Sequence, residues 1–378
     1  MIIKTDAFKK IGATILAAID NSEISTLTET LELKTVGRTL YLNTTNGEYY
    51  VSVTFPLDHD EDFHATVNAN LFLKLLAATT SEDIELTIKD TYVLVKGNGT
   101  YKLPLIFEGD HLLELPKICL ENKTLEMKIG GAILESIDNY NSKELLRGTI
   151  SHPVQKMYYM DEQGCITFTT GACINNFQLE KPIRVLLSNR IVKLFKLFKN
   201  DMVDFALGYD PITEDLIQTK VSLSTPNIKL VAITGCTDDL LNAVPVAAIR
   251  ARGAADYKYS LVISTEALKQ SISRLLLFSA GKGVSKNVKP YSMFKYDPAT
   301  NVLNVSDANQ ENQEGVHIEN RPSNVGNDTY EMVLDLMDLK SVLDTVTDKY
   351  ITFEFGNHKA VAIKRQAITN IIPECKSK

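Results

Sequence analysis

No stretch of this sequence approaches the ~18 consecutive apolar residues that a membrane-spanning helix needs. The first residues also lack the charged segment and apolar core of an export signal. We therefore expect neither membrane insertion nor export, and a cytoplasmic location. Cysteine is scarce, and the absence of a C-x-x-C pair disfavours a disulfide framework or a zinc knuckle. The five cysteines are Cys119, Cys165, Cys173, Cys236 and Cys375.

Motifs for catalysis and nucleotide binding are missing too. The sequence has no G-x-S-x-G elbow, and nothing marks a Ser, Cys and His constellation or a pair of acid and base carboxylates. Residues 279–285 lack the early glycine and the Lys-Ser/Thr pair of a P-loop, and they follow a predicted helix where a strand is needed. We expect no catalytic residue and no cofactor. These absences make an enzyme less favoured without excluding one.

Two polar segments resemble metal-binding loops only superficially. Residues 59–64 contain two histidines and three carboxylates that could bind a divalent cation, although a solvated loop is the stronger interpretation. Residues 307–315 carry calcium-like oxygens at the wrong spacing, without the glycine at the sixth position. The sequence therefore predicts no metal site.

The composition is that of an ordinary globular protein. A chain of 378 residues with 44% hydrophobic and 23% charged residues exceeds the size of one core, so two or three domains are expected. Low-complexity tracts are missing, and the whole chain should fold. The net charge of −7 disfavours a protein that coats DNA with its entire surface, but it permits a basic channel inside an acidic body.

One order of elements, helix, strands, helix, strands, recurs in each third of the chain. In the first third we predict a helix over residues 8–19, a hairpin around the Asn46-Gly47 turn, a helix from about residue 70, and strands near 84–89 and 92–96. The middle third gives helices over 129–140 and 189–198, with strands over 145–179 and 203–234. The last third gives helices over 265–278 and 337–346, with strands over 293–296, 302–305, 351–355 and 360–365.

This periodicity predicts an α+β protein with antiparallel sheets and three similar domains. Ser188 or Asn189 and Asp335 or Asp338 stand where helix N-caps are needed. Residues 115–122 and 250–256 are the predicted linkers. The domains are accordingly an N-terminal one over 1–120, a central one over 121–252 and a C-terminal one over 253–378.

The pattern resembles the bacterial DNA sliding clamps, the DNA polymerase III beta subunit family, over essentially the whole chain. The resemblance is carried by residues 31–34 (Leu-Glu-Leu-Lys), 40–45 (Leu-Tyr-Leu-Asn-Thr-Thr), 164–171 (Gly-Cys-Ile-Thr-Phe-Thr-Thr-Gly), 301–309 (Asn-Val-Leu-Asn-Val-Ser-Asp-Ala-Asn) and 370–374 (Asn-Ile-Ile-Pro-Glu). The chain departs from the family at residues 169–174, where Thr-Thr-Gly-Ala-Cys-Ile stands in place of Thr-Asp-Gly-His-Arg-Leu. The basic pair is lost, so the partner motif is expected to differ.

The resemblance implies a processivity factor: a head-to-tail homodimeric ring whose helices line a hole around double-stranded DNA, without reading its sequence. The spacing of charges agrees with a DNA-facing helix. In the predicted helix over 189–198 and directly after it, cations recur every third residue, opposite an apolar stripe. A solvated helix face is the alternative. The expected DNA-binding residues are Lys9, Lys10, Lys74, Lys143, Arg147, Arg190, Lys193, Lys196, Lys199, Lys269 and Arg274.

By the same resemblance, an apolar pocket receives a short peptide of the DNA polymerase or the clamp loader. Its expected residues are Thr169, Gly171, Ile174, Asn242, Ala243, Pro245, Ile371, Ile372, Pro373 and Glu374, against the alternative that the isoleucines are ordinary core. The expected dimer interface joins Tyr101 and Leu103 to Leu277 and Phe278, unless these four are interior residues.

Two rival interpretations of the function remain. One is a β-rich hydrolase with converging carboxylates, and the other is a scaffold protein without DNA in its hole.

Overall fold

A computed structural model describes residues 1–20, 26–144, 150–213, 216–234, 237–279, 290–307, 309–320 and 329–375. Arg147 and Cys236, both named above, lie outside these ranges. The chain forms two compact units: the first comprises residues 1–135 and 190–236, the second residues 136–189 and 237–378. These units do not test the predicted domain boundaries at 120 and 252, which stay a prediction.

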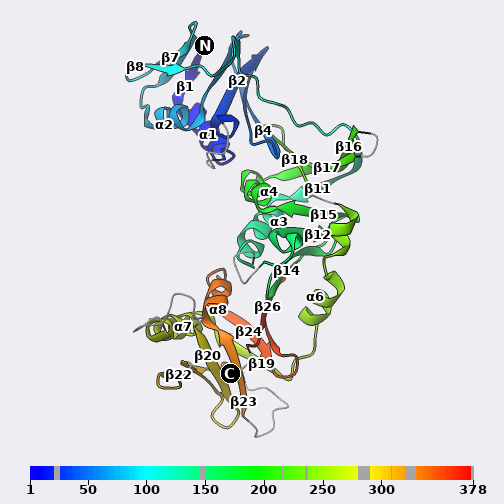
Figure 1. Ribbon diagram of the computed structural model, residues 1–378. Helices are drawn as coiled ribbons and strands as arrows, with labels where there is room; N and C mark the ends of the chain where they lie inside the picture. The colour runs from blue at the N-terminus through cyan, green and yellow to red at the C-terminus, as the bar shows by residue number, and fades with distance from the viewer. Residues whose placement is uncertain are drawn as a thin grey trace. The chain divides into compact units, whose positions relative to one another are not determined.

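The first unit contains two main antiparallel sheets (Figure 1). The four-stranded sheet has the order β1 (Ile2–Lys4), β6 (Asp83–Ile88), β7 (Tyr92–Lys96), β8 (Thr100–Pro104). The eight-stranded sheet has the order β11 (Lys123–Gly130), β16 (Met202–Thr213), β17 (Leu216–Ser224), β18 (Ile228–Ile233), β4 (Tyr49–Pro56), β3 (Thr39–Thr45), β2 (Thr30–Val36), β5 (His64–Asn68). Its middle pair, β18 and β4, joins segments far apart in sequence, with Leu230 opposite Val51.

Helices cover the sheets of the first unit. The elements are α1 (Thr5–Leu16), η1 (Thr26–Glu29), α2 (Ala69–Ala78), most of α3 (Gly131–Ser136), most of α4 (Asn189–Lys193) and the 3₁₀ helix η5 (Leu194–Phe198), beside the short hairpin β9 (Phe107–Glu108) and β10 (His111–Leu112). Phe8 of α1 is fully buried, and its ring lies 5.9 Å from that of Phe72 on α2 and 5.7 Å from that of Phe55 on β4. Burying one such ring contributes ~1.5–3 kcal/mol.

The second unit repeats the pairing of a large and a small antiparallel sheet. The eight-stranded sheet has the order β15 (Arg184–Ser188), β12 (Met157–Asp161), β13 (Gly164–Phe168), β14 (Ala172–Asn176), β26 (Ile368–Pro373), β25 (Ala360–Arg365), β24 (Tyr350–Phe355), β19 (Tyr259–Ser264). The four-stranded sheet has the order β22 (Gln313–His317), β21 (Val302–Asp307), β20 (Tyr291–Asp297), β23 (Tyr330–Asp335). Its helical elements are η2 (Ile137–Asn141), η4 (Pro153–Lys156), α5 (Asp238–Asn242), α6 (Val246–Gly253), α7 (Thr265–Ser279) and α8 (Leu336–Leu343).

The predicted α+β class with antiparallel sheets is confirmed, and so are several local signals. The Asn46-Gly47 turn joins β3 to β4, with Gly47 at φ +85°, a conformation that glycine adopts without strain. Asp335 caps α8, because its side chain accepts hydrogen bonds from the backbone of Met337 and Asp338. Residues 115–122 contain neither helix nor strand, as expected of a linker.

Three predicted segments need correction. The helix predicted over 129–140 starts only at Gly131, because β11 runs through Gly130, and it continues as the π turn η2. Gly131 packs so closely on η5 that a Cβ atom there would lie 1.9 Å from the carbonyl oxygen of Phe198. The helix predicted over 189–198 changes from α to 3₁₀ at Leu194. The linker predicted over 250–256 begins inside α6, whose face packs on β14 and β26.

Candidate functional site

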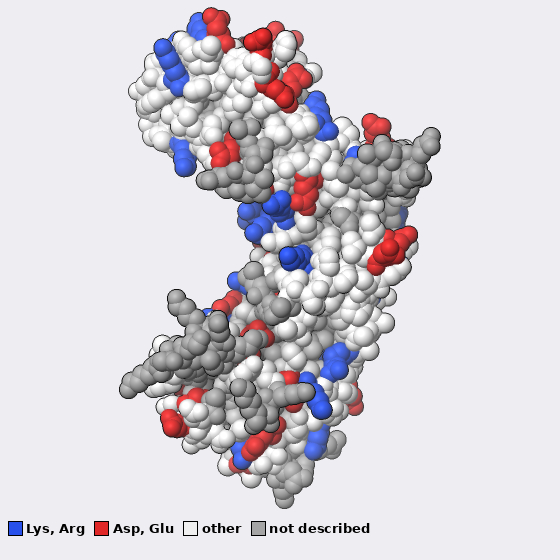
Figure 2. Space-filling view, in the orientation of Figure 1, with Lys and Arg blue, Asp and Glu red and all other residues white. Residues whose placement is uncertain are grey.

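Three lysines form a row on α4 and η5 in the first unit. Lys193, Lys196 and Lys199 are all exposed, and a 3₁₀ helix has three residues per turn, so this spacing keeps them on one face. Most of the residues before and between them are buried, namely Ile191, Val192, Leu194, Phe195 and Phe198, and Leu197 is half-buried. Within the described part of the chain, no carboxylate lies within ion-pair distance of any of the three ammonium groups. Figure 2 shows Lys and Arg side chains gathered where Figure 1 places α4.

Arg190 differs from the lysines that follow it. Its guanidinium lies 3.9 Å from the carboxylate of Asp20 and 3.7 Å from that of Glu48. Asp20 also accepts a hydrogen bond from the side chain of Asn46, at 3.0 Å. Arg190 therefore ties the start of α4 to the β3–β4 turn, and its charge is partly offset by these two acids.

The remaining predicted cations divide between the two units. In the first unit Lys10 on α1 and Lys74 on α2 are exposed, and Lys9 is half-buried. In the second unit Lys143 is exposed, whereas Lys269 Nζ donates a hydrogen bond to the carbonyl of Val346 at 2.8 Å. Arg274 makes a two-point contact with Glu314, Nε to Oε1 at 2.7 Å and Nη2 to Oε2 at 2.5 Å. This contact lowers the pKa of the Glu314 carboxyl.

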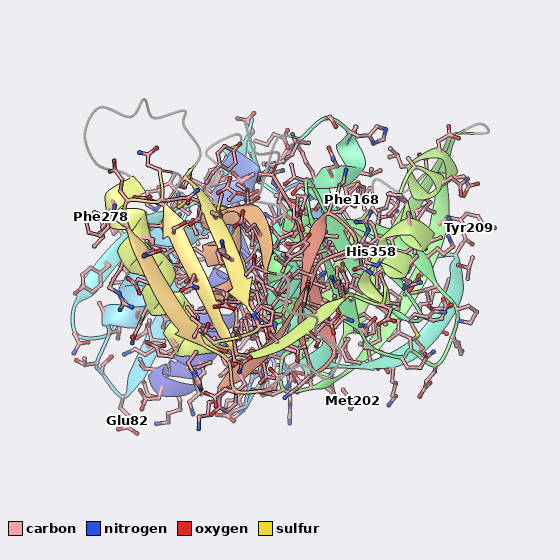
Figure 3. All side chains as sticks on the ribbon, turned by 90° about the horizontal axis from the view of Figure 1, so that it is seen from below. Glu82, Phe168, Met202, Tyr209, Phe278 and His358 are labelled. Atoms are coloured by element: carbon pink, nitrogen blue, oxygen red, sulfur yellow. The ribbon has the colours of Figure 1, made fainter. Side chains whose placement is uncertain are left out.

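A hollow of about 440 Å³ lies in the second unit, where four segments meet. These are the turn between β13 and β14, helix α6, the turn between β24 and β25, and the end of β26. Pairing of β14 with β26 sets Ala172 opposite Ile371 and so joins two of its walls. Its lining is Phe168, Thr169, Thr170, Gly171, Ala172, Ala248, Ile249, Arg252, His358, Lys359, Ala360, Ile371 and Pro373. Figure 3 labels two of these residues, Phe168 and His358.

A second hollow, of about 420 Å³, adjoins the first at Ala248, which lines both. Its lining is Tyr159, Arg184, Leu241, Asn242, Val244, Pro245, Val246, Ala247 and Ala248. Arg184 Nη2 donates a hydrogen bond to the side-chain oxygen of Asn242 at 3.1 Å. Both hollows lie against α6 and are lined mainly by apolar side chains, and we call the two together the α6 groove.

The α6 groove collects six of the ten predicted pocket residues. Thr169, Gly171, Ile371 and Pro373 line the first hollow, and Asn242 and Pro245 line the second. Ile372 does not line it, since alternate residues of a strand face opposite ways, and its side chain lies in the core with Phe353 and Leu339. Ile174 is buried behind the groove, Ala243 is exposed beside it, and Glu374 accepts a hydrogen bond from the hydroxyl of Tyr330.

Hydrogen bonds fix the lip of the groove. The Thr169 backbone N–H donates to the carbonyl of Gly171 at 3.0 Å, which closes the turn. The Thr169 hydroxyl donates to the buried carboxylate of Glu144 at 3.0 Å. The Gln155 side chain donates to the Thr169 carbonyl at 3.4 Å. Sequence reasoning missed Glu144 and Gln155, because each reaches Thr169 only through the fold.

No protein-family model and no curated protein sequence matches the chain. Solved structures match it throughout. The DNA polymerase III beta subunit of Pseudomonas aeruginosa superposes with a TM-score of 0.76 at 13% identity, covering 100% of this chain and 99% of that one. The beta subunit of Thermotoga maritima gives 0.75 at 13% identity, with 99% and 98% covered. The Helicobacter pylori beta clamp gives 0.73 at 13% identity, with 100% and 99% covered.

The chain has the sliding-clamp fold. The expected resemblance is thus confirmed over the full length, at a sequence identity that establishes the fold alone. In this clamp fold β8 is an edge strand of its sheet, where Tyr101 is 43% exposed while Leu103 is buried. Leu277 and Phe278, near the end of α7, are 73% and 58% exposed. Figure 3 labels Phe278. Three of the four predicted interface residues therefore face solvent in the single chain.

The carboxyl groups give no sign of an acid and base pair in the groove. Neither lining contains an aspartate or a glutamate, and Glu374, whose pKa is raised by burial, lines neither hollow. Described His, Cys, Asp and Glu side chains form no group that could hold a metal ion. His64 of the acidic segment instead contacts the buried carboxylate of Glu32 at 3.0 Å. No described helix is long and apolar enough to span a membrane.

Proposed function

We propose that the protein is a DNA sliding clamp: a ring that encircles duplex DNA and tethers a polymerase to it. The observation that carries this proposal is the row of free lysines on α4 and η5 within a full-length clamp fold. In this proposal the protein acts without catalytic residues of its own. The printed descriptions of the structurally similar proteins, DNA polymerase III beta subunits, support the polymerase partnership.

The lysine row suits contact with DNA that must not stop sliding. Long, flexible ammonium side chains reach phosphates without reading base edges, so they add affinity that is independent of sequence and sensitive to salt. Lys10 and Lys74 offer two further exposed cations in the same unit. The net charge of −7 keeps the rest of the surface from binding DNA strongly.

Closure of the ring requires a second copy. In this proposal the first domain of each chain meets the third domain of the other, which covers the open edge of β8 and the exposed Tyr101, Leu277 and Phe278. The α6 groove then serves as the docking site for an extended peptide of the polymerase or of the clamp loader. Both sites act by binding alone.

A topological experiment tests encirclement. The purified chain should have a mass near twice 42.1 kDa by light scattering. Mixed at high concentration with nicked circular plasmid, it should co-elute with the DNA in gel filtration at high salt. Cutting the plasmid once should release it, because a ring slides off a free end. A monomer at all concentrations, or equal retention on cut and uncut plasmid, would contradict the ring.

Charge reversal tests the lysine row. The triple variant Lys193→Glu, Lys196→Glu, Lys199→Glu should weaken duplex binding by at least about tenfold in low salt, since three phosphate contacts are lost. The matched control is Lys89→Glu, Lys117→Glu, Lys229→Glu, which makes the same change in net charge at three exposed positions outside the helices. Equal losses in both variants would mean that only net charge matters, and that the row is not the DNA-contacting surface.

A further inference from the structure

The charged side chains at the rim of the α6 groove are all positive. Arg252 and Lys359 line the first hollow and Arg184 lines the second, whereas neither lining contains an aspartate or a glutamate. The floor between these cations is apolar: Phe168, Ala172, Ile249, Ala360, Ile371 and Pro373. A peptide that fills the floor would therefore place its polar side chains against positive charge only.

Nearby carboxylates offset this rim only in part, because the charge of Lys359 acts on the carboxylate of Glu374. Asp161 is 2.6 Å from Arg250, which lies outside both linings, and Glu374 is held by the Tyr330 hydroxyl at 3.1 Å. In the described chain, none of the three rim cations has a carboxylate within ion-pair distance. The positive charge is thus available to a ligand.

The rim is also held in place before any ligand arrives. Arg252 Nη1 donates a hydrogen bond to the backbone carbonyl of His358, which joins α6 to the β24–β25 turn. The imidazole of His358 lies edge-on to the Tyr257 ring, 5.0 Å away, and Nε2 contacts the Asp256 carbonyl at 3.1 Å. Arg252 keeps its other N–H groups for a second acceptor. A fixed cation loses less conformational entropy when a carboxylate binds.

We propose that the α6 groove selects an extended peptide that is both apolar and acidic, whose carboxylates pair with Arg252 and Lys359 while its apolar side chains fill the two hollows. This inference rests on the proposed function of the groove as a docking site and names the chemistry of its partner. The cations come from α6 and from the β24–β25 turn. They do not come from the start of β14, where residues 172 and 173 are Ala and Cys in place of a basic pair.

Three fluorescein-labelled decapeptides test the preference by anisotropy with the full-length chain. All three carry leucine and phenylalanine at the same positions, and the residues between them are aspartate, asparagine or lysine. The aspartate peptide should bind about tenfold more tightly than the asparagine peptide, since two partly exposed ion pairs together supply ~1.4 kcal/mol. The lysine peptide should bind most weakly. Raising the salt from about 0.05 M to about 0.5 M should shrink the difference.

Variants separate the rim from the floor. The double variant Arg252→Gln, Lys359→Gln should bind the aspartate and asparagine peptides equally, with the asparagine affinity unchanged within about twofold. Ala248→Trp fills the junction of the hollows and should weaken all three peptides. Lys117→Gln removes one exposed charge outside the groove and should keep the aspartate preference.

The outcomes distinguish this inference from the function on which it rests. Equal binding of the aspartate and asparagine peptides to the wild type would overturn the charge preference and leave the groove as a docking site. Weakened binding of all peptides to Ala248→Trp would support that site independently. Failure of every peptide to bind would overturn both the preference and the groove's proposed role.

Discussion

Two helical segments that both carry predicted DNA-binding cations hold their positive charge differently. The lysines on α4 and η5 project from an apolar stripe and have no described acidic partner. On α7, Lys269 is hydrogen-bonded to a backbone carbonyl and Arg274 to Glu314. Both sets were predicted to contact DNA, the first from the spacing of its cations and the second from its place on a helix expected to line the hole. Glu314 offsets the charge of Arg274, whereas the lysines on α4 and η5 leave their charge available to a phosphate.

The difference comes from what each helix packs against. Helix α7 contacts β21 and β22, and β22 brings Glu314 under Arg274 from 40 positions along the chain. Spacing along a helix reveals which side chains share a face. It cannot reveal which charge a neighbouring strand places opposite that face, so the availability of a cation is a property of the fold.

Removing the apolar support of the lysine row should have the largest effect. Phe195 is fully buried beneath η5, so Phe195→Ala should lower the free energy of unfolding by ~3–5 kcal/mol through lost contacts and a cavity. Urea denaturation of the wild type and the variant measures this difference in the free energy of unfolding. Lys196→Ala on the exposed face is the control and should stay within ~0.5 kcal/mol. Similar small losses in both variants would mean that the row is not anchored through this ring.

Local signals were predictable where neighbours in sequence decide them. The Asn46-Gly47 turn, the Asp335 cap and the buried stripe of η5 all follow from a few adjacent residues. Contacts between distant residues were not: the sequence gives no sign that Arg252 reaches the His358 carbonyl, that Glu144 holds Thr169, or that Glu32 receives His64. Gly253 and the small residues around it suggested a linker over 250–256, whereas residues 250–253 are the last turn of α6, which packs on β14 and β26.

Single substitutions sharpen the contrast between the two helices in DNA binding. Lys196→Gln should reduce the slope of log affinity against log salt by about 0.9 for duplex DNA, which corresponds to one phosphate contact. Arg274→Gln should leave that slope unchanged, because its guanidinium is already committed to Glu314. Fluorescence anisotropy with a labelled duplex over a series of salt concentrations gives both slopes. A larger change from Arg274→Gln would show that the ion pair opens to bind DNA.

Acid titration should detect the Arg274 ion pair itself, as the smallest of the three effects. The hydrogen bond from Arg274 holds the pKa of Glu314 below its ordinary value of 4.5. A depressed carboxyl pKa adds stability above pH 4.5 that is lost as the pH falls toward the folded-state value, because the unfolded chain then binds the proton more readily. The thermal midpoint of Arg274→Gln should therefore lie slightly below that of the wild type at pH 7, and the gap should close below pH 4.5. A gap that does not narrow as the pH falls below 4.5 would mean that Arg274 stabilises α7 through its aliphatic stem and not through this ion pair.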